Sequence, residues 1–170
     1  MLKSMMFIDG SNLFHVLRSI CVEKQDPSYK IDFEALTKVH QNLGESKLIR
    51  IYYFTSAPAI VPEPQQNFFH RLEFAGVRVI LGELRDSPEG YREKGVDVNI
   101  ACHALKLSSH YDECCLLTHD QDLIPVSAAL QDLGKTVTLW SYRTKTPARL
   151  LRSVDRTINM VDYWDILRVT

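Results

Sequence analysis

The stretch Leu116–Leu123, which reads Leu-Leu-Thr-His-Asp-Gln-Asp-Leu, decides how the chain is expected to fold. The apolar run Cys114–Leu117 predicts a buried strand, and the apolar stripe from Leu123 to Leu133 predicts a helix. Between them stand Asp120 and Asp122, one residue apart. Two carboxylates at the mouth of a buried strand repel each other unless a cation lies between them. The stretch therefore predicts a strand-to-helix turn that carries a metal site.

Short apolar runs alternate with amphipathic stretches along the whole chain. The strands are expected at 2–8, 48–54, 77–81, 114–117, 136–140 and 158–161. The helices are expected at 13–20, 33–43, 68–75, 96–107, 123–133, 147–154 and 163–167. The polar segment 82–95, with its proline and glycines, is expected to be an exposed, mobile loop. This alternation predicts an α/β fold of three layers, with helices on both faces of a mainly parallel sheet.

Composition narrows the class of protein. A chain of 170 residues is expected to form a single domain, residues 1–170, and its net charge of −1 gives no overall attraction to polyanions. The four cysteines form no CxxC pair, and no apolar run is long enough to span a bilayer. No leader segment opens the chain, so we expect a cytoplasmic protein with no membrane contact.

Two further aspartates occupy positions like that of Asp120. Asp9 ends the first predicted strand in Ile8-Asp9-Gly10-Ser11-Asn12, and Asp97 opens the helix after Gly95. Taken singly, Asp9 is explained as a turn residue, and Asp97 and Asp120 as acids that are favourable at the start of a helix. Asp122 and Asn12 are each explained as the cap of the helix that they adjoin. Jointly they lie where an open α/β sheet binds ligands. Oxygen-only ligands predict Mg²⁺ or Mn²⁺ rather than zinc.

Three motifs resemble the signatures of the NYN domain, a member of the PIN-like nuclease superfamily that includes LabA-like proteins. They are Ile8-Asp9-Gly10-Ser11-Asn12-Leu13, Lys94-Gly95-Val96-Asp97 and Thr118-His119-Asp120-Gln121-Asp122-Leu123. The resemblance covers nearly the whole chain, in order. It implies a PIN-like fold and a Mg²⁺- or Mn²⁺-dependent ribonuclease site. The acids implied as metal ligands and catalytic residues are Asp9, Asp97, Asp120 and Asp122.

The third motif departs from the family pattern, which usually reads Ser-Gly-Asp-Ser-Asp-Phe. Thr118 replaces serine, His119 replaces glycine, Gln121 replaces serine and Leu123 replaces phenylalanine, while both acids are kept. We expect His119 to be a solvent-facing turn residue. An imidazole acting beside the metal is the alternative.

Supporting roles are expected for three residues near the acids. Asn12 could orient a carboxylate or a metal-bound water, or simply cap the helix. Thr118 could hydrogen-bond Asp9 or a ligand, or be an ordinary strand threonine. Lys94, from its motif position, could contact a phosphate, although a solvated loop charge is the better explanation for this residue taken alone.

The segment Gly134–Val154 contains basic residues and no acid. Its candidate RNA-binding residues are Arg143, Lys145, Arg149 and Arg152. Trp140 and Tyr142 stand next to them and could stack on bases. A solvated basic face is the alternative explanation.

These patterns predict a metal-dependent endoribonuclease that acts on single-stranded or structured RNA through a metal-activated water. The alternative is a non-catalytic RNA- or protein-binding regulatory module on the same fold. A small-molecule phosphohydrolase is less consistent, because haloacid-dehalogenase-type enzymes carry paired aspartates after the first strand, where this chain has Asp9-Gly10-Ser11. A homodimer is compatible with the sequence but is indicated by no feature of it.

Overall fold

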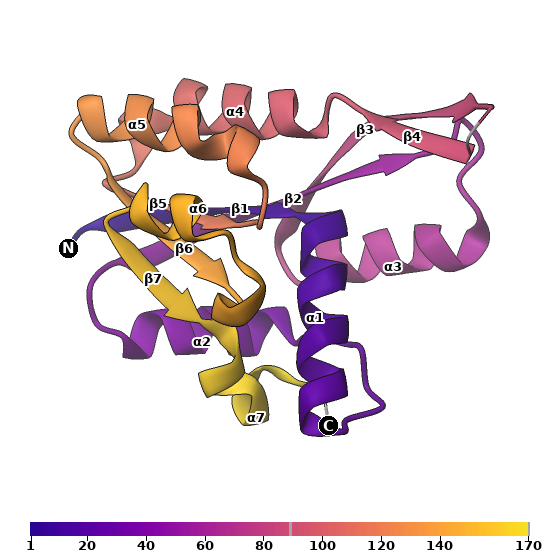
Figure 1. Ribbon diagram of the computed structural model, residues 1–170, viewed down its shortest axis with the longest axis horizontal. Coiled ribbons are helices and arrows are strands. Elements are labelled where there is room, and N and C mark those ends of the chain that lie inside the picture. Colours follow the sequence, from indigo (N-terminus) through magenta and orange to yellow (C-terminus); the bar gives the residue numbers. More distant parts are fainter. Residues whose placement is uncertain (89, 170) are drawn as a thin grey trace.

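The first strand of the chain lies inside a seven-stranded sheet, in the order β4-β3-β2-β1-β5-β6-β7 (Figure 1). The computed structural model describes residues 1–88 and 90–169. Neighbouring strands are parallel except for β3 and β4, which are antiparallel. The strands are β1 (Lys3–Asp9), β2 (Lys47–Ala57), β3 (Val77–Ser87), β4 (Gly90–Lys94), β5 (Glu113–Leu117), β6 (Thr136–Ser141) and β7 (Arg156–Asn159).

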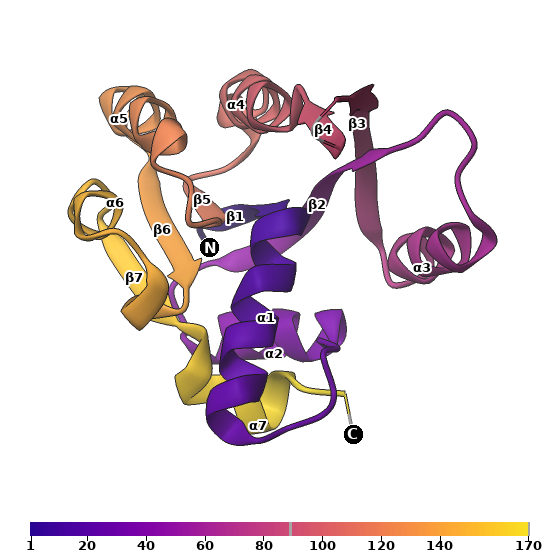
Figure 2. The same cartoon turned by 45° about the vertical axis from the view of Figure 1, so that its right-hand side comes forward.

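Helices cover both faces of the sheet, which confirms the predicted three-layer α/β fold (Figures 1 and 2). One core joins the sheet to α1, α2, α3 and α7, and the second joins it to α4, α5 and α6. The helices are α1 (Gly10–Lys24), α2 (Phe33–Asn42), α3 (Glu63–Phe74), α4 (Val96–Lys106), α5 (Ile124–Asp132), α6 (Ala148–Arg152) and α7 (Trp164–Leu167).

The sequence of β1 shows why both faces are covered. Met6 and Ile8 belong to the first core, whereas Met5 and Phe7 belong to the second. Because alternate residues of a strand point to opposite faces, a strand buried on both sides must be apolar at nearly every position. The strand ends at Asp9, where this apolar run gives way to a carboxylate.

The prediction of a loop over residues 82–95 is wrong. The backbone of β3 continues to Ser87 and pairs antiparallel with β4, from Glu83 opposite Lys94 to Ser87 opposite Gly90. An edge hairpin satisfies its backbone groups by pairing and needs no apolar run, so a polar sequence with glycines is compatible with it. Glu89 and the side chains of 85–87 and 91–94 lie outside the described residues.

The last strand also differs from expectation. β7 ends at Asn159 rather than at Val161, and a 3₁₀ turn, Met160–Tyr163, leads from it into α7.

In the described part of the chain, no helix is long and apolar enough to cross a membrane.

Asp26, in the loop after α1, links the C-terminal helix α7 and the residue after it to the rest of the chain through hydrogen bonds. Its Oδ1 accepts a hydrogen bond from the Ser28 backbone N–H at 2.8 Å. Its Oδ2 accepts from the indole Nε1 of Trp164 at 3.1 Å and from Nη1 of Arg168 at 3.2 Å. The Ser28 N–H, with Arg168 and Trp164, holds the pKa of Asp26 below its ordinary value of 3.8, against a smaller effect of burial.

We therefore expect Asp26→Asn to lower the free energy of unfolding at pH 7. Because the carboxyl pKa is depressed in the folded state, its stabilising effect is present above pH 3.8 and is lost as the pH falls through the folded-state pKa. Urea unfolding of wild type and variant between pH 7 and pH 3 measures this. Asp165→Asn, at an exposed acid 3.9 Å from Arg168, is the matched control with little effect. A difference that stayed constant with pH would contradict the assignment.

Candidate metal edge

The carboxyl ends of β1 and β5 meet at one edge of the sheet. The two strands are parallel neighbours, with Ile8 opposite Leu117. Asp9 follows Ile8, and Thr118-His119-Asp120 follows Leu117. Both predicted acidic turns therefore emerge side by side, as expected for ligands of an open α/β sheet.

Asn12 ties these two turns together. Its side-chain Nδ2 donates a short hydrogen bond to Oδ2 of Asp9, and its Oδ1 accepts from the backbone N–H of His119 at 3.1 Å. Asp9 is buried, and its Oδ1 also accepts from the Asn12 N–H at 3.2 Å and from the Ser11 hydroxyl at 3.1 Å. Asp9 is thus the N-cap of α1, so the expectation that Asn12 caps this helix is wrong.

Gly10 is required where β1 turns into α1. A Cβ added there would lie 2.6 Å from Cζ of Tyr53 and 2.8 Å from the carbonyl oxygen of Phe54. Both contacts are closer than a side chain tolerates, and one is to backbone that cannot move aside. The absence of a side chain lets the start of α1 pack against β2, which fixes where Asp9 and Asn12 lie.

Thr118 positions Asp120. The Thr118 side chain is buried, and its Oγ1 accepts from the Asp120 N–H at 3.0 Å. Asp120 is half-buried, and its Oδ1 accepts from the Asp122 N–H at 2.8 Å, which makes Asp120 the N-cap of the 3₁₀ turn Gln121–Leu123. The predicted cap role of Asp122 is therefore wrong, and its exposed carboxylate is not used as the cap.

Asp97 lies in the first turn of α4, two residues after Gly95. Gly95 has φ of 81°, a left-handed conformation that favours glycine. The helix packs against β1 and against the turn Gln121–Leu123, and Asp97 is half-buried. The side chain of Lys94, the third predicted supporting residue, lies outside the described residues.

His119 is not the solvent-facing residue expected from the sequence. It is half-buried, and its Nε2 accepts from the backbone N–H of Tyr142 at 3.4 Å. Burial lowers the pKa of this imidazole, and the nearby His15 lowers it further. The residue that replaces the family's usual glycine therefore connects the acidic turn to the end of β6.

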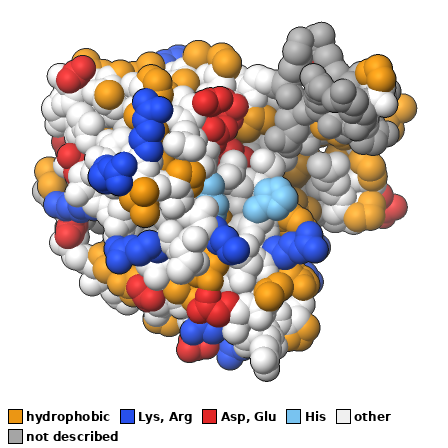
Figure 3. Space-filling model, in the orientation of Figure 1, with side chains coloured by type: hydrophobic (Ala, Val, Ile, Leu, Met, Phe, Trp, Pro, Cys, Tyr) orange, Lys and Arg blue, Asp and Glu red, His pale blue; other side chains and the backbone are white. Residues whose placement is uncertain are grey.

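The four predicted RNA-binding residues, Arg143, Lys145, Arg149 and Arg152, are all exposed. They follow β6 in the chain, directly after Tyr142 and its contact with His119. Figure 3 shows acidic side chains gathered at the upper centre of one face, with Lys and Arg side chains on the surface beside and beneath them. The stacking role expected of Trp140 and Tyr142 is wrong, because both rings are buried.

The family model for the NYN domain matches residues 3–162. The chain belongs to the NYN family. NYN domains are part of the PIN-like nuclease superfamily, whose members generally use divalent metals, and NYN nucleases typically act on RNA.

Solved structures agree on the fold. A protein of unknown function from Vibrio parahaemolyticus is 20% identical, with a TM-score of 0.78 over 99% of this chain and 96% of that one. A nicotinamidase from Staphylococcus aureus is 8% identical, with a TM-score of 0.38 over 89% of this chain and 87% of that one. The TM-score of that second structure is too low for it to bear on function. A comparison with curated proteins finds no match.

The donor atoms at this edge suit a hard cation. The acids offer carboxylate oxygens from three separate segments, and Mg²⁺ typically takes one or two carboxylates while keeping several waters. Among the described residues, no three of these four acids place oxygens all within 4.8 Å of one another. Bound water between carboxylates and ion accommodates such spacing. The group that does meet this distance is His40, Glu113 and Cys115, at the other end of β5.

The bridge formed by Asn12 gives a stability prediction. Asn12→Ala removes two side-chain hydrogen bonds and leaves the His119 N–H and one Asp9 oxygen without these partners, so we expect a loss of about 1–3 kcal/mol in the free energy of unfolding. Chemical denaturation measures the loss. Ser11→Ala removes a single bond to Asp9 and should cost less than about 1.5 kcal/mol. Equal effects of the two variants would show that Asn12 does not link the turns.

Proposed function

We propose that this NYN protein is a Mg²⁺- or Mn²⁺-dependent endoribonuclease whose centre is the shared carboxyl edge of β1 and β5. The observation that carries the proposal is the Asn12 side chain, which hydrogen-bonds Asp9 on one side and the turn before Asp120 on the other. The helix cap needs neither contact, because it is made by the Asn12 backbone N–H donating to Asp9. The arrangement instead fixes two carboxylates from distant segments relative to each other.

Asp9, Asp97, Asp120 and Asp122 are the residues that would hold the ion. When bound, the divalent ion supplies Lewis-acid stabilisation of the phosphoryl charge and lowers the pKa of a coordinated water. The protein's own contribution is preorganisation. Hydrogen bonds donated by Ser11 and Asn12 hold Asp9, and the Thr118 hydroxyl oxygen holds the Asp120 turn by accepting from the Asp120 N–H. These groups are in place before substrate arrives, so little reorganisation is needed during the reaction.

RNA would approach along the exposed basic segment after β6. Phosphates bind cationic side chains with an electrostatic affinity that is independent of sequence. Arg143, Lys145, Arg149 and Arg152 are exposed, and their segment begins at the residue that contacts His119. A strand held by this segment would therefore reach the acidic turn. Since Trp140 and Tyr142 are buried, binding by these residues rests on charge rather than on stacking.

A non-catalytic RNA- or protein-binding module is the second candidate. The observation that favours it is the spacing of the acids, since no three of the four bring their oxygens within 4.8 Å in the described part of the chain. Such a module would bind RNA equally well in EDTA and would show no turnover when Mn²⁺ is added.

Asp120→Asn tests the catalytic assignment. Loss of groups that merely support a metal ligand costs about 10- to 100-fold in activity, so loss of a ligand should lower cleavage about 100-fold or more. Cleavage of labelled single-stranded and structured RNA with Mn²⁺, Mg²⁺ or EDTA measures this. Asp132→Asn, at an exposed acid in the last turn of α5, is the matched control and should leave cleavage unchanged. Metal-dependent cleavage retained in Asp120→Asn would refute the assignment.

The double variant Arg149→Ala/Arg152→Ala tests the RNA surface. Removing two phosphate contacts should weaken RNA binding and reduce the slope of log affinity against log salt by roughly 1.4. Fluorescence anisotropy at several salt concentrations measures the slope. Arg50→Ala, at an exposed arginine in β2, is the matched control. An unchanged slope in the double variant would mean that RNA binds elsewhere.

A further inference from the structure

A buried polar cluster lies at the amino end of β5, opposite to the acidic edge. Glu113 begins β5 and Cys115 lies two residues on, so both side chains point to the same face of the sheet. His40 of α2 covers them from that side. The three residues are 5%, 0% and 3% exposed respectively. One ligand atom from each lies within 4.8 Å of the other two.

Hydrogen bonds determine which nitrogen of His40 is free. Ser46 donates its single hydroxyl proton to Oε2 of Glu113. Nε2 of His40 lies 3.0 Å from the Ser46 oxygen and 2.8 Å from the Ser4 hydroxyl, so two hydroxyl groups occupy this nitrogen. Nδ1 faces the sulfur instead, 3.9 Å from Sγ of Cys115. A neutral ring that carries its proton on Nε2 donates to a hydroxyl oxygen and leaves the Nδ1 lone pair for a metal ion.

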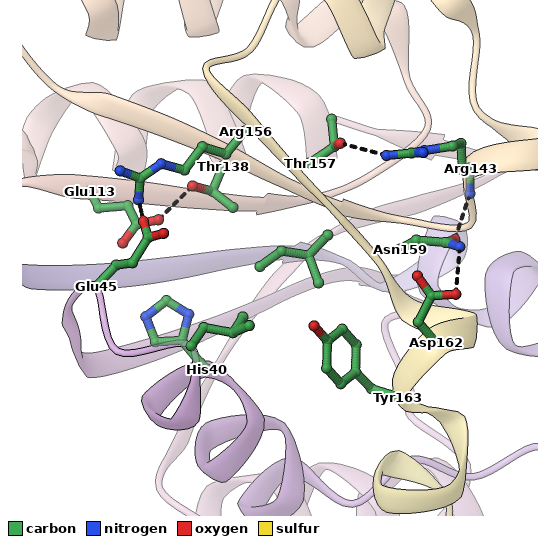
Figure 4. Close-up of a pocket in the computed structure, with 12 residues that line it drawn as sticks. His40, Glu45, Glu113, Thr138, Arg143, Arg156, Thr157, Asn159, Asp162 and Tyr163 are labelled. Atoms are coloured by element: carbon green, nitrogen blue, oxygen red, sulfur yellow. Dashed lines mark hydrogen bonds and ion pairs between the residues drawn. The ribbon is translucent and has the colours of Figure 1, made fainter.

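Glu113 is a buried carboxylate with no cationic partner among the described residues. Besides the Ser46 bond, its Oε1 accepts from the Thr138 hydroxyl at 2.5 Å. In the described part of the chain, no lysine or arginine forms an ion pair with it, and the nearby Arg156 pairs with Glu45 (Figure 4). Two hydroxyl donors leave further lone pairs on the carboxylate. A buried charge of this kind is costly unless a cation compensates it.

Trp140 supplies a second, independent observation. Its indole Nε1 is buried and has no hydrogen-bond partner among the described residues. Trp140 packs in the same core as Cys115, and the centroid of its ring lies 6.1 Å from that of His40. A thiol is a weak hydrogen-bond acceptor, whereas a metal-bound thiolate accepts N–H donors well. A thiolate in this cluster is the kind of acceptor that the buried indole N–H lacks.

We propose that His40 Nδ1, Cys115 Sγ and a Glu113 carboxylate oxygen bind one Zn²⁺-class transition-metal ion. The mixed nitrogen, sulfur and oxygen set suits zinc and not the hard ion expected at the acidic edge. With Zn–S near 2.3 Å and Zn–N near 2.0 Å, tetrahedral geometry puts the two ligand atoms roughly 3.6 Å apart, close to the observed 3.9 Å. On binding, the Cys115 S–H bond breaks, an S–metal bond forms and the proton leaves to solvent.

A cavity of about 470 Å³ gives the ion a route in and an open fourth position. His40 and Glu113 line it, and Arg143 and Asn159 lie along its far side (Figure 4). Thr118 lies five residue steps along the chain from Glu113, roughly 16 Å at the usual rise of a strand, so the zinc site and the acidic edge are separate. The proposal therefore does not depend on the proposed ribonuclease activity.

Cobalt(II) titration of the full chain, freed of metal with a chelator, tests the proposal. We expect one equivalent of Co²⁺ to give a thiolate-to-cobalt charge-transfer band that Zn²⁺ then abolishes. Cys115→Ser should lose the band. Cys114→Ser is the matched control, because Cys114 is equally buried but belongs to the core on the other face, and it should keep the band. No band in the wild type, or a band retained in Cys115→Ser, overturns the proposal.

Two further variants keep the test decisive if Cys115→Ser fails to fold. Glu113→Gln keeps the size of the side chain and one acceptor oxygen but removes the charge, and should weaken Zn²⁺ binding tenfold or more. Added Zn²⁺ should raise the melting temperature of the wild type and of Cys114→Ser but not of Glu113→Gln. Asp120→Asn should keep full Zn²⁺ affinity, which separates this site from the nuclease centre. Equal Zn²⁺ affinity in Glu113→Gln and wild type would show a purely structural hydrogen-bond network.

Discussion

The arrangement of the two acidic turns depends on the pair of hydrogen bonds that Asn12 makes across the carboxyl edge of the sheet. Through Nδ2 it holds Asp9, and through Oδ1 it holds the backbone of His119. Parallel pairing of β1 with β5 brings the two turns to the same edge, but pairing alone does not set their side chains. The amide of Asn12 does, and Gly10 makes this possible by letting the start of α1 pack closely on β2.

Much of this was readable from the sequence because it depends on local pattern. The apolar runs and helical stripes gave the elements, and acids placed directly after strands gave the edge. The choice of capping residue was not readable. Asp9 rather than Asn12 caps α1, and Asp120 rather than Asp122 caps the 3₁₀ turn Gln121–Leu123. Aspartate and asparagine both cap helices well, so the residue types do not distinguish the candidates. The half-buried position of His119 depends on Tyr142, a contact made through the sheet order.

The β3–β4 hairpin and the His40 cluster escaped prediction for the same physical reason. A polar edge strand carries no apolar periodicity, so residues 82–95 resembled a loop until pairing was visible. His40, Glu113 and Cys115 come from α2 and β5 with no ligand spacing in sequence, and β5 alone shows just two side chains on one face. The two ends of β5 thus present different donors: oxygen at the carboxyl end, and mixed nitrogen, oxygen and sulfur at the amino end.

The central claim is that the carboxyl edge of β1 and β5 binds a divalent ion. Anomalous diffraction from crystals soaked in Mn²⁺ tests it most directly, because it locates the ion without relying on a substrate. The account predicts a manganese peak at the carboxylates of Asp9 and Asp120, which disappears in Asp120→Asn. A peak confined to His40, Glu113 and Cys115, or the absence of any peak at the aspartates, would contradict it.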